Sequence, residues 1–116
     1  MSEDDTDVGT VAAVLADDCA RDILEATVTQ PMSAARLGEH CDVSEPTVYR
    51  KLEALRDLDL IESRTRLDED GHHHDVYTAT LDRAIVDLTE DGFRLRVTRR
   101  ERMADRFTRF VEEMRR

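Results

Sequence analysis

The chain has 116 residues, among them no tryptophan, two cysteines and four glycines. It contains no apolar run near the length of about 18 residues that a membrane-spanning helix needs, so no spanning helix is expected. With so few glycines there is no glycine-rich loop for phosphate groups, and no nucleophile is patterned with a base. The sequence therefore does not indicate an enzyme, and we expect no cofactor.

Cysteine is confined to Cys19 and Cys41. Their spacing differs from the Cys-x-x-Cys pattern of zinc and redox motifs. Reduced thiols in a cytoplasmic protein are the expected state. The alternatives are a disulfide between the two, a pair of redox-sensing thiols, and buried thiols that act as small hydrophobic side chains.

Acidic residues outnumber basic ones, 27 to 17, and the formal net charge is −10. Taken alone, this charge argues against nucleic-acid binding. The acidity is concentrated in residues 1–70, with 18 acidic and 7 basic side chains, whereas residues 71–116 have 9 and 10. Lysine occurs once, beside 16 arginines. This composition resembles that of proteins from extremely halophilic archaea, where molar salt screens charges within about 3 Å.

The first part of the chain predicts an acidic tail and two helices. Residues 1–7 are acidic and lack the pattern of a signal peptide, so we expect a disordered tail. Asp17 or Asp18 can cap the second helix, which Pro31 ends. The inward residues of the two helices are expected to be Val8, Val11, Ala12 and Leu15, followed by Cys19, Ala20, Ile23, Leu24 and Val28.

Residues 33–59 predict two crossing helices joined by a short turn. Ser33 caps the first helix and Ser44 the second, in which Pro46 stands in the first turn, where its missing N–H costs nothing. The second helix should end near Asp59, because aspartate tolerates the left-handed conformation. Such a pair presents its second helix to a DNA major groove. The side chains expected to face inward are Leu37, Cys41, Val48, Leu52 and Leu55.

Two alternating stretches within residues 60–81 flank a polar tip and predict a β-hairpin, the wing. A second hairpin is predicted over residues 82–98, because apolar residues alternate there on both sides of Asp91-Gly92, a strong turn signal. A short helix over residues 82–90 is the alternative.

Apolar residues with helical spacing predict a C-terminal helix over residues 99–116 with a single apolar seam. A seam of this kind is typical of paired helices, so we expect it to pack against a second copy of the chain in a homodimer. The alternative is that it folds back on its own domain. The residues expected at the dimer interface are Met103, Phe107, Phe110, Val111 and Met114.

The order of these elements resembles the winged helix-turn-helix transcriptional regulators of the ArsR-like superfamily, many of which occur in haloarchaea. It also resembles the PadR-like regulators with a C-terminal dimer helix. The most specific match consists of Leu37, residues 43–52, Leu55 and Leu60-Ile61, although Asp59 stands where the family pattern has glycine.

The resemblance implies a mainly α fold with a small β component. A winged helix-turn-helix domain would occupy residues 8–81, with a β-hairpin wing, followed by a C-terminal dimerisation helix. It further implies a cytoplasmic, homodimeric regulator that binds double-stranded DNA, favours an inverted-repeat operator and has no membrane partner.

In the second helix of the pair, a rotation of about 100° per residue places Pro46, Thr47, Tyr49, Arg50 and Glu53 away from the apolar stripe. Arg50 can donate two hydrogen bonds to guanine. The capping serines suit phosphate oxygens, and the outward wing arginines suit phosphates or a minor groove, unless they pair with carboxylates across the wing. The candidate DNA contacts are Ser33, Ser44, Glu45, Pro46, Thr47, Tyr49, Arg50, Lys51, Arg64 and Arg66.

Two alternatives to this function stay open. A winged helix can bind proteins through the same face, and salt bridges that occupy Arg50 and Lys51 would favour that role. A metal- or redox-sensing regulator would differ only in its input. His72–His74 offer metal-ligand side chains, but neighbouring side chains of a strand point to opposite faces, so no metal site is expected.

Overall fold

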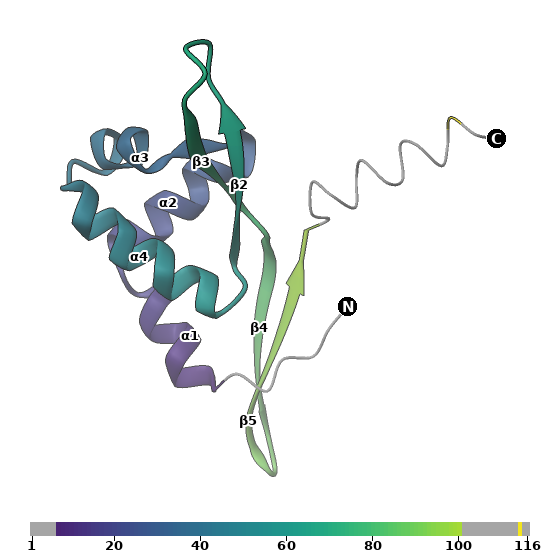
Figure 1. Ribbon diagram of the computed structural model, residues 1–116. Helices are drawn as coiled ribbons and strands as arrows, with labels where there is room; N and C mark the ends of the chain where they lie inside the picture. Colours follow the sequence, from purple (N-terminus) through teal and green to yellow (C-terminus); the bar gives the residue numbers. More distant parts are fainter. Residues whose placement is uncertain (1–6, 101–113, 115–116) are drawn as a thin grey trace.

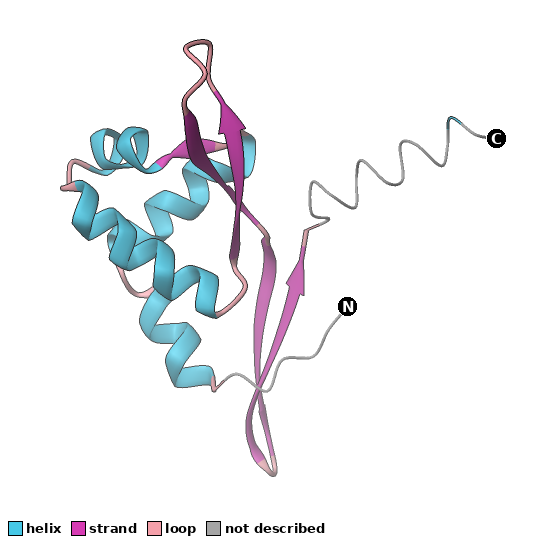
Figure 2. Cartoon of the chain, viewed as in Figure 1, coloured by secondary structure: helices cyan, strands magenta, loops and turns pink. Residues whose placement is uncertain are grey.

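The computed structural model describes residues 7–100 and residue 114. Within these residues, four short helices lie beside the wing, and a second hairpin extends from the other end of the domain (Figure 1). Figure 2 shows the helices gathered on one side and the strands on the other. The elements are α1 (Val8–Leu15), α2 (Asp18–Thr29), β1 (Met32–Ser33), α3 (Ala34–Cys41), α4 (Glu45–Asp57), β2 (Ile61–Leu67), β3 (His73–Ala79), β4 (Leu81–Thr89) and β5 (Gly92–Arg99).

Four helices with small antiparallel sheets fit a winged helix-turn-helix fold. None of the described helices is long and apolar enough to cross a membrane. The predicted C-terminal dimerisation helix lies outside the described residues, apart from Met114 and the first two residues of its predicted range. The first of these two, Arg99, is the last residue of β5.

The predicted caps of three helices are confirmed. The side chains of Asp17, Ser33 and Ser44 each accept a hydrogen bond from the N–H three residues further along, at 2.8, 3.2 and 3.4 Å. Each cap satisfies a backbone donor that has no partner within the first turn of its helix.

The turn between α3 and α4 is tight. Asp42 adopts a left-handed conformation with φ 56°, and the Val43 N–H donates to the Gly38 carbonyl oxygen at 3.0 Å. A Cβ atom on Gly38 would lie only 3.0 Å from the Val43 carbonyl oxygen. The absence of a side chain at Gly38 therefore allows the turn to close onto α3.

The hydrophobic core is shared by the helices, the wing and β5. In α4 the predicted stripe of Val48, Leu52 and Leu55 is buried. Burial of a leucine side chain contributes about 1.5–3 kcal/mol relative to exposure. The core consists of Val11, Ala20, Ile23, Leu24, Met32, Ala34, Leu37, Val48, Leu52, Leu55, Leu60, Ile61, Tyr77, Ala79, Leu95 and Val97.

Two expectations for the first helices are wrong. Val28 is 42% exposed, and Thr27 is buried in its place. The Thr27 hydroxyl donates to the Ile23 carbonyl oxygen at 2.8 Å, so the threonine enters the core with its polar group satisfied. Ala12 is exposed, and Val14 packs against the core instead.

The wing is a three-stranded antiparallel sheet in the order β1-β3-β2. β2 and β3 pair from Ile61 opposite Ala79 to Leu67 opposite His73. β1 contributes only two residues and was not predicted, because two residues are too few to show an alternating pattern. β3 is therefore the central strand, and its backbone is paired along both edges.

β4 and β5 form a separate two-stranded antiparallel sheet. Their pairing places apolar side chains opposite one another on one face. At the base of the hairpin, Leu95 and Val97 are buried, and α1 packs against β5. Toward the tip, Val86, Leu88 and Phe93 are 52, 75 and 67% exposed. Within the described chain, this apolar face is thus covered only at its base.

The corner between α4 and β2 is held by later segments of the chain. Asp59 is left-handed there, with φ 55°, as its sequence position predicts. Its carbonyl oxygen accepts hydrogen bonds from the Thr80 hydroxyl at 3.0 Å and from Arg99 Nε at 2.7 Å. Arg99 Nη2 also donates to the Leu58 carbonyl oxygen at 3.0 Å. Arg99 thus satisfies carbonyl groups that follow the end of α4 and ties the hairpin to them.

Replacement of Arg99 by alanine should destabilise the fold, because these carbonyl groups lose a charged donor whose side chain is only 13% exposed. We expect the free energy of unfolding to fall by about 2–4 kcal/mol, since hydrogen bonds to charged groups contribute about 1.5–3 kcal/mol each. Urea unfolding followed by circular dichroism measures the change.

The matched control is Arg94→Ala, since Arg94 is an exposed arginine of the same strand. This variant should change the free energy of unfolding by less than about 0.5 kcal/mol. Equal losses in the two variants would show that Arg99 does not hold the corner.

Candidate nucleic-acid interface

Three polar side chains follow one another along the exposed side of α4. Ser44 Oγ lies 3.0 Å from Thr47 Oγ1, and Arg50 Nη2 donates to Thr47 Oγ1 at 3.3 Å. A spacing of three residues places these side chains on the same side of the helix. The contact draws the Arg50 guanidinium toward the N-terminus of α4, the part of a recognition helix that contacts base edges.

The other residues predicted on this face lie at the surface. Glu45, Pro46 and Glu53 are exposed, and Tyr49 is 51% exposed. Arg50 is exposed as well and forms no ion pair with a residue that the structure describes. The face therefore offers a guanidinium, a phenol and carboxylates to an outside partner.

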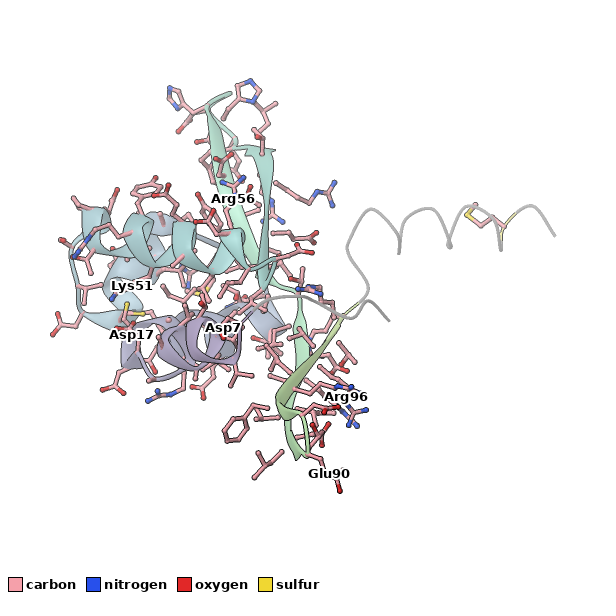
Figure 3. The ribbon with its side chains drawn as sticks, turned by 90° about the horizontal axis from the view of Figure 1, so that it is seen from below. Asp7, Asp17, Lys51, Arg56, Glu90 and Arg96 are labelled. Atoms are coloured by element: carbon pink, nitrogen blue, oxygen red, sulfur yellow. The ribbon has the colours of Figure 1, made fainter. Side chains whose placement is uncertain are left out.

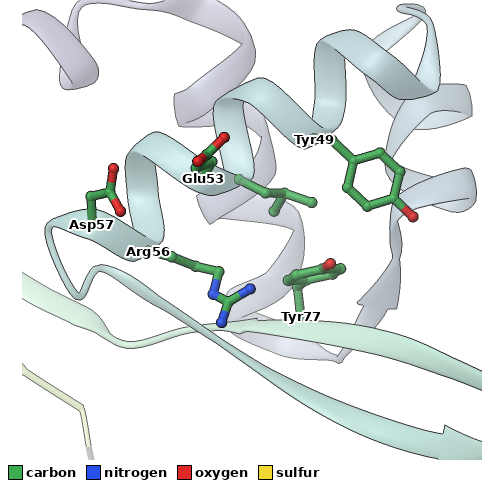
Figure 4. Close-up of a pocket in the computed structure, with 6 residues that line it drawn as sticks. Tyr49, Glu53, Arg56, Asp57 and Tyr77 are labelled. Atoms are coloured by element: carbon green, nitrogen blue, oxygen red, sulfur yellow. The ribbon is translucent and has the colours of Figure 1, made fainter.

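A groove of about 490 Å³ runs between the second half of α4 and the wing (Figure 4). Tyr49, Glu53 and Arg56 line it from α4, and Tyr77 lines it from β3. Figure 4 shows the Arg56 guanidinium turned toward Tyr77. Burial, followed by the nearby Asp75 carboxylate, raises the pKa of Tyr77. Its hydroxyl therefore stays protonated at neutral pH and can donate a hydrogen bond.

A second groove, also of about 490 Å³, separates the N-termini of α3 and α4 from the wing. Ser33 and Glu45 line its helical side, and Thr65 and Asp75 line its wing side. Tyr49 lines both grooves, so together they form one concave surface, here called the α4–wing surface. The fold thus brings Ser33 and the N-terminus of α4 close to wing residues that are distant in the sequence.

Arg64 and Arg66 lie on the wing face turned away from Tyr77. In the β2–β3 register, Arg64 is opposite Val76 and Arg66 is opposite His74. Val76 and His74 are each an odd number of residues from Tyr77, so the side chains of both arginines point to the other face of the sheet. Both arginines are exposed, and neither forms an ion pair with another described residue. The alternative, in which Arg64 and Arg66 pair with carboxylates across the wing, is therefore not seen among the described residues.

Lys51 points toward α2 and away from the α4–wing surface. Its Nζ atom lies 2.9 Å from Asp17 Oδ1 (Figure 3). Lys51 precedes Leu52 and so stands at the edge of the buried stripe, where it can reach the neighbouring helix. The prediction that Lys51 contacts DNA is at odds with this geometry, and we leave Lys51 out of the proposed interface.

The same ion pair acts on Asp17. The hydrogen bond from Lys51, followed by the one from the Ala20 N–H, lowers the pKa of the Asp17 carboxyl. Asp17 therefore has two roles, because it caps α2 and also holds α4 against it.

Three side chains at the wing tip could take part in binding a metal ion. The ligand atoms of Asp68, Asp70 and His72 lie within 4.8 Å of one another, and all three residues are exposed. Asp68 Oδ1 already accepts hydrogen bonds from two backbone N–H groups of the tip, at 3.0 and 2.8 Å. The trio falls short of a full tetrahedral ligand set. His73 and His74 follow on β3, where neighbouring side chains point to opposite faces.

The predicted dimer interface lies at the end of the chain. Met103, Phe107, Phe110 and Val111 fall outside the described residues. Met114 is described and is 70% exposed. This interface therefore stays a prediction.

Sequence patterns did not assign three further residues to this region. Arg56 is not among the predicted DNA contacts, although its spacing of seven residues from Tyr49 places both on one side of α4. The position of Tyr77 beside α4 depends on how the wing packs. The Asp17–Lys51 contact joins residues 34 positions apart, for which no local pattern gives a signal.

A comparison with known families matches residues 15–64 to a model described as a helix-turn-helix domain. The matched segment runs from the end of α1 into the wing and includes the tight turn between α3 and α4. No curated protein matches the chain. Residues 15–64 are therefore similar to a helix-turn-helix domain, a similarity that suggests a DNA-binding regulator.

The double role of Asp17 predicts different effects for two substitutions. Asp17→Ala removes both the cap and the ion pair, so the free energy of unfolding should fall by about 1–2 kcal/mol. Asp17→Asn keeps a capping oxygen and should cost less. Urea unfolding at neutral pH measures both variants.

The lowered pKa adds a pH dependence. The ionised Asp17 carboxyl stabilises the fold fully above its ordinary pKa of 3.8, and this contribution is lost as the pH falls through the lower folded-state value. Between neutral pH and about pH 3, the unmodified chain should therefore lose more stability than Asp17→Asn. The control is Asp18→Asn, since Asp18 is 92% exposed. Parallel pH profiles for all three chains would contradict the role of the ion pair.

Proposed function

We propose that this protein is a sequence-specific, DNA-binding transcriptional regulator that acts as a homodimer in a high-salt cytoplasm. It would be a winged helix-turn-helix regulator of the ArsR-like or PadR-like type, from a haloarchaeon. In this proposal α4 enters the major groove, and the wing lies along the neighbouring backbone or minor groove.

The observation that carries this proposal is the exposed position of the Arg50 side chain on α4. It is exposed on the outer face of α4, forms no ion pair with a described residue and is drawn by Thr47 toward the N-terminus of the helix. A guanidinium in this position can donate two hydrogen bonds to O6 and N7 of a guanine. Arg50 is therefore the proposed base-reading residue.

The surrounding residues have supporting roles in the proposal. Thr47 and Tyr49 would contact a thymine methyl group or a phosphate, and Glu45 would accept a hydrogen bond from a cytosine amine. The N-termini of α3 and α4, at Ser33 and Ser44, suit phosphate oxygens. Pro46 would pack against the DNA backbone. Arg64 and Arg66, the exposed arginines of the wing, would contact phosphates or a minor groove.

The acidic composition sets the conditions for binding. Affinity that comes from counterion release falls steeply as salt rises, and a chain of net charge −10 gains little from it. In molar salt, shape fit and base contacts would have to supply most of the specificity. Arginines on α4 and the wing that form no ion pair with a described residue provide such contacts without a strongly basic surface.

A winged helix that binds proteins through the same face is the second candidate. It would be favoured if salt bridges occupied Arg50, Lys51 and the wing arginines. Of these, Lys51 is paired with Asp17 of the same chain. Arg50, Arg64 and Arg66 form no ion pair with a described residue. The described geometry therefore favours DNA as the partner.

A second copy of the chain is the proposed partner for the apolar residues at the end of the chain. The seam at Met103, Phe107, Phe110, Val111 and Met114 follows directly after β5 in the sequence. The exposed apolar side chains of the β4–β5 hairpin, Val86, Leu88 and Phe93, offer further area to bury. A two-fold dimer would place two copies of α4 about 34 Å apart, which suits an inverted-repeat operator.

The first prediction of this proposal concerns DNA affinity. Arg50→Ala should weaken binding to the selected site by about 10- to 100-fold, because a bidentate arginine–guanine contact is worth about 1–3 kcal/mol. Fluorescence anisotropy in molar KCl measures this, with operator fragments first selected from upstream regions of the source genome.

Arg83→Ala is the control for charge, since Arg83 is an exposed arginine on β4, outside the α4–wing surface. It should leave affinity within about twofold. If the unmodified, folded chain selects no sequence, or if both variants bind equally well, the base-reading role of Arg50 fails.

The second prediction concerns the homodimer. Leu88→Asp should weaken dimerisation by tenfold or more, to order of magnitude, because it places a charge on an apolar face that the dimer would bury. Leu67→Asp is the matched control, since Leu67 is a 59% exposed leucine on the wing. Phe107→Asp tests the C-terminal seam in the same way. Sedimentation equilibrium gives the dimer constants, and an unmodified chain that sediments as a monomer would refute the proposed dimer.

A further inference from the structure

The groove between the second half of α4 and the wing contains an arginine whose charge is not paired. Arg56 is an exposed residue in the last turn of α4, and it forms no ion pair with another described residue. Glu53 and Asp57 line the same groove. Figure 4 shows the Arg56 guanidinium turned toward Tyr77 of β3, with the two carboxylates directed away from it. The guanidinium is therefore available to an anion that enters the groove.

The hydroxyl group of Tyr77 is a second polar group in this groove that lacks a partner. Tyr77 is only 3% exposed, and its side chain forms no hydrogen bond with a residue in the described part of the chain. Every fully buried polar side-chain atom of the described residues does have a hydrogen-bond partner. The Tyr77 oxygen is therefore not enclosed in the core but opens into the groove that Tyr77 lines. Because burial raises the pKa of Tyr77, the hydroxyl is protonated at neutral pH and can donate to an anion.

The proposed function places a DNA strand at this groove. With α4 in the major groove and the wing at the neighbouring minor groove, one sugar-phosphate strand separates the two elements. That strand must cross the α4–wing surface, in which the groove is one of the two hollows. The anion that reaches the groove is then a phosphate group of the DNA backbone, an assignment that rests on the proposed function.

We propose that Arg56 and Tyr77 together bind one phosphate group of the DNA strand that crosses between α4 and the wing. The guanidinium donates two hydrogen bonds to the phosphate oxygens, a geometry for which arginine is suited, and the Tyr77 hydroxyl donates a third. Glu53 repels other phosphates from the groove, so the contact is confined to the position at Arg56. A phosphate contact fixes the register of a protein on DNA and carries no sequence information. Arg56 and Tyr77 thus position the helix on which Arg50 reads a base.

Fluorescence anisotropy with the full chain separates this positioning role from base reading. Arg56→Ala should weaken binding to the selected operator fragment and to a scrambled fragment by the same factor, about five- to tenfold, because a phosphate contact is independent of sequence. The slope of log affinity against log KCl concentration should become shallower by about 1, which corresponds to one lost phosphate contact. Arg50→Ala should instead weaken binding mainly to the selected fragment.

A change on the DNA side identifies the phosphate itself. In a series of operator fragments, each phosphate in turn is replaced by an uncharged methylphosphonate. One position should weaken binding of the unmodified chain by about five- to tenfold and should have no further effect on Arg56→Ala, because the partner of that phosphate is already missing. Tyr77→Phe keeps the buried ring and removes only the hydroxyl, so it should reduce the effect at the same position by a smaller factor.

The control for charge is Arg83→Ala on β4, which should stay within about twofold of the unmodified chain at every salt concentration. All variants are first verified as folded by circular dichroism. If the unmodified chain binds the operator and Arg56→Ala binds it equally tightly with the same salt slope, the phosphate site is refuted and the proposed function stands. A change in the sequence that Arg56→Ala selects would also overturn the proposal, because Arg56 would then contact a base. An unmodified, folded chain that binds no DNA would refute the proposed function and this site with it.

Discussion

The left-handed corner at Asp59 is the constraint on which the site depends. Its φ of 55° turns the chain from α4 into the wing, and its carbonyl oxygen accepts hydrogen bonds from Thr80 and Arg99. These donors come from the end of the wing and the end of the second hairpin. The direction of α4, the wing and the hairpin base are therefore fixed at one point. Because of this corner, Tyr49 and Tyr77 line one groove.

The helix that carries the proposed base contact is restrained on the side that faces the domain. The tight turn at Gly38 fixes where α4 begins, and the ion pair between Lys51 and Asp17 holds its middle against α2. On the outer face, Arg50 forms no ion pair with any residue in the described part of the chain. A rigid support with an unoccupied outer face is what specific recognition requires, since little ordering is then needed on binding.

Charge and apolar surface together limit how this chain can act. The excess of acidic residues disfavours a large, unspecific attraction to DNA. It also keeps the domain hydrated, while the apolar tip of the β4–β5 hairpin stays exposed in the described chain. Under the proposed function, molar salt would screen the repulsion between the acidic protein and DNA. It would also favour burial of the apolar hairpin tip in a dimer.

The sequence by itself determined the local elements. The serine and aspartate caps, the stripe of α4 and the left-handed Asp59 follow from backbone chemistry within a few residues, and so does the wing hairpin. The same reasoning was wrong at Val28 and Ala12, where packing of whole helices selected other residues for burial. Only the tertiary structure decided that Lys51 faces Asp17 and that Arg99 holds the end of α4. These contacts join segments far apart in the chain, and their geometry depends on how the helices cross, which no local periodicity records.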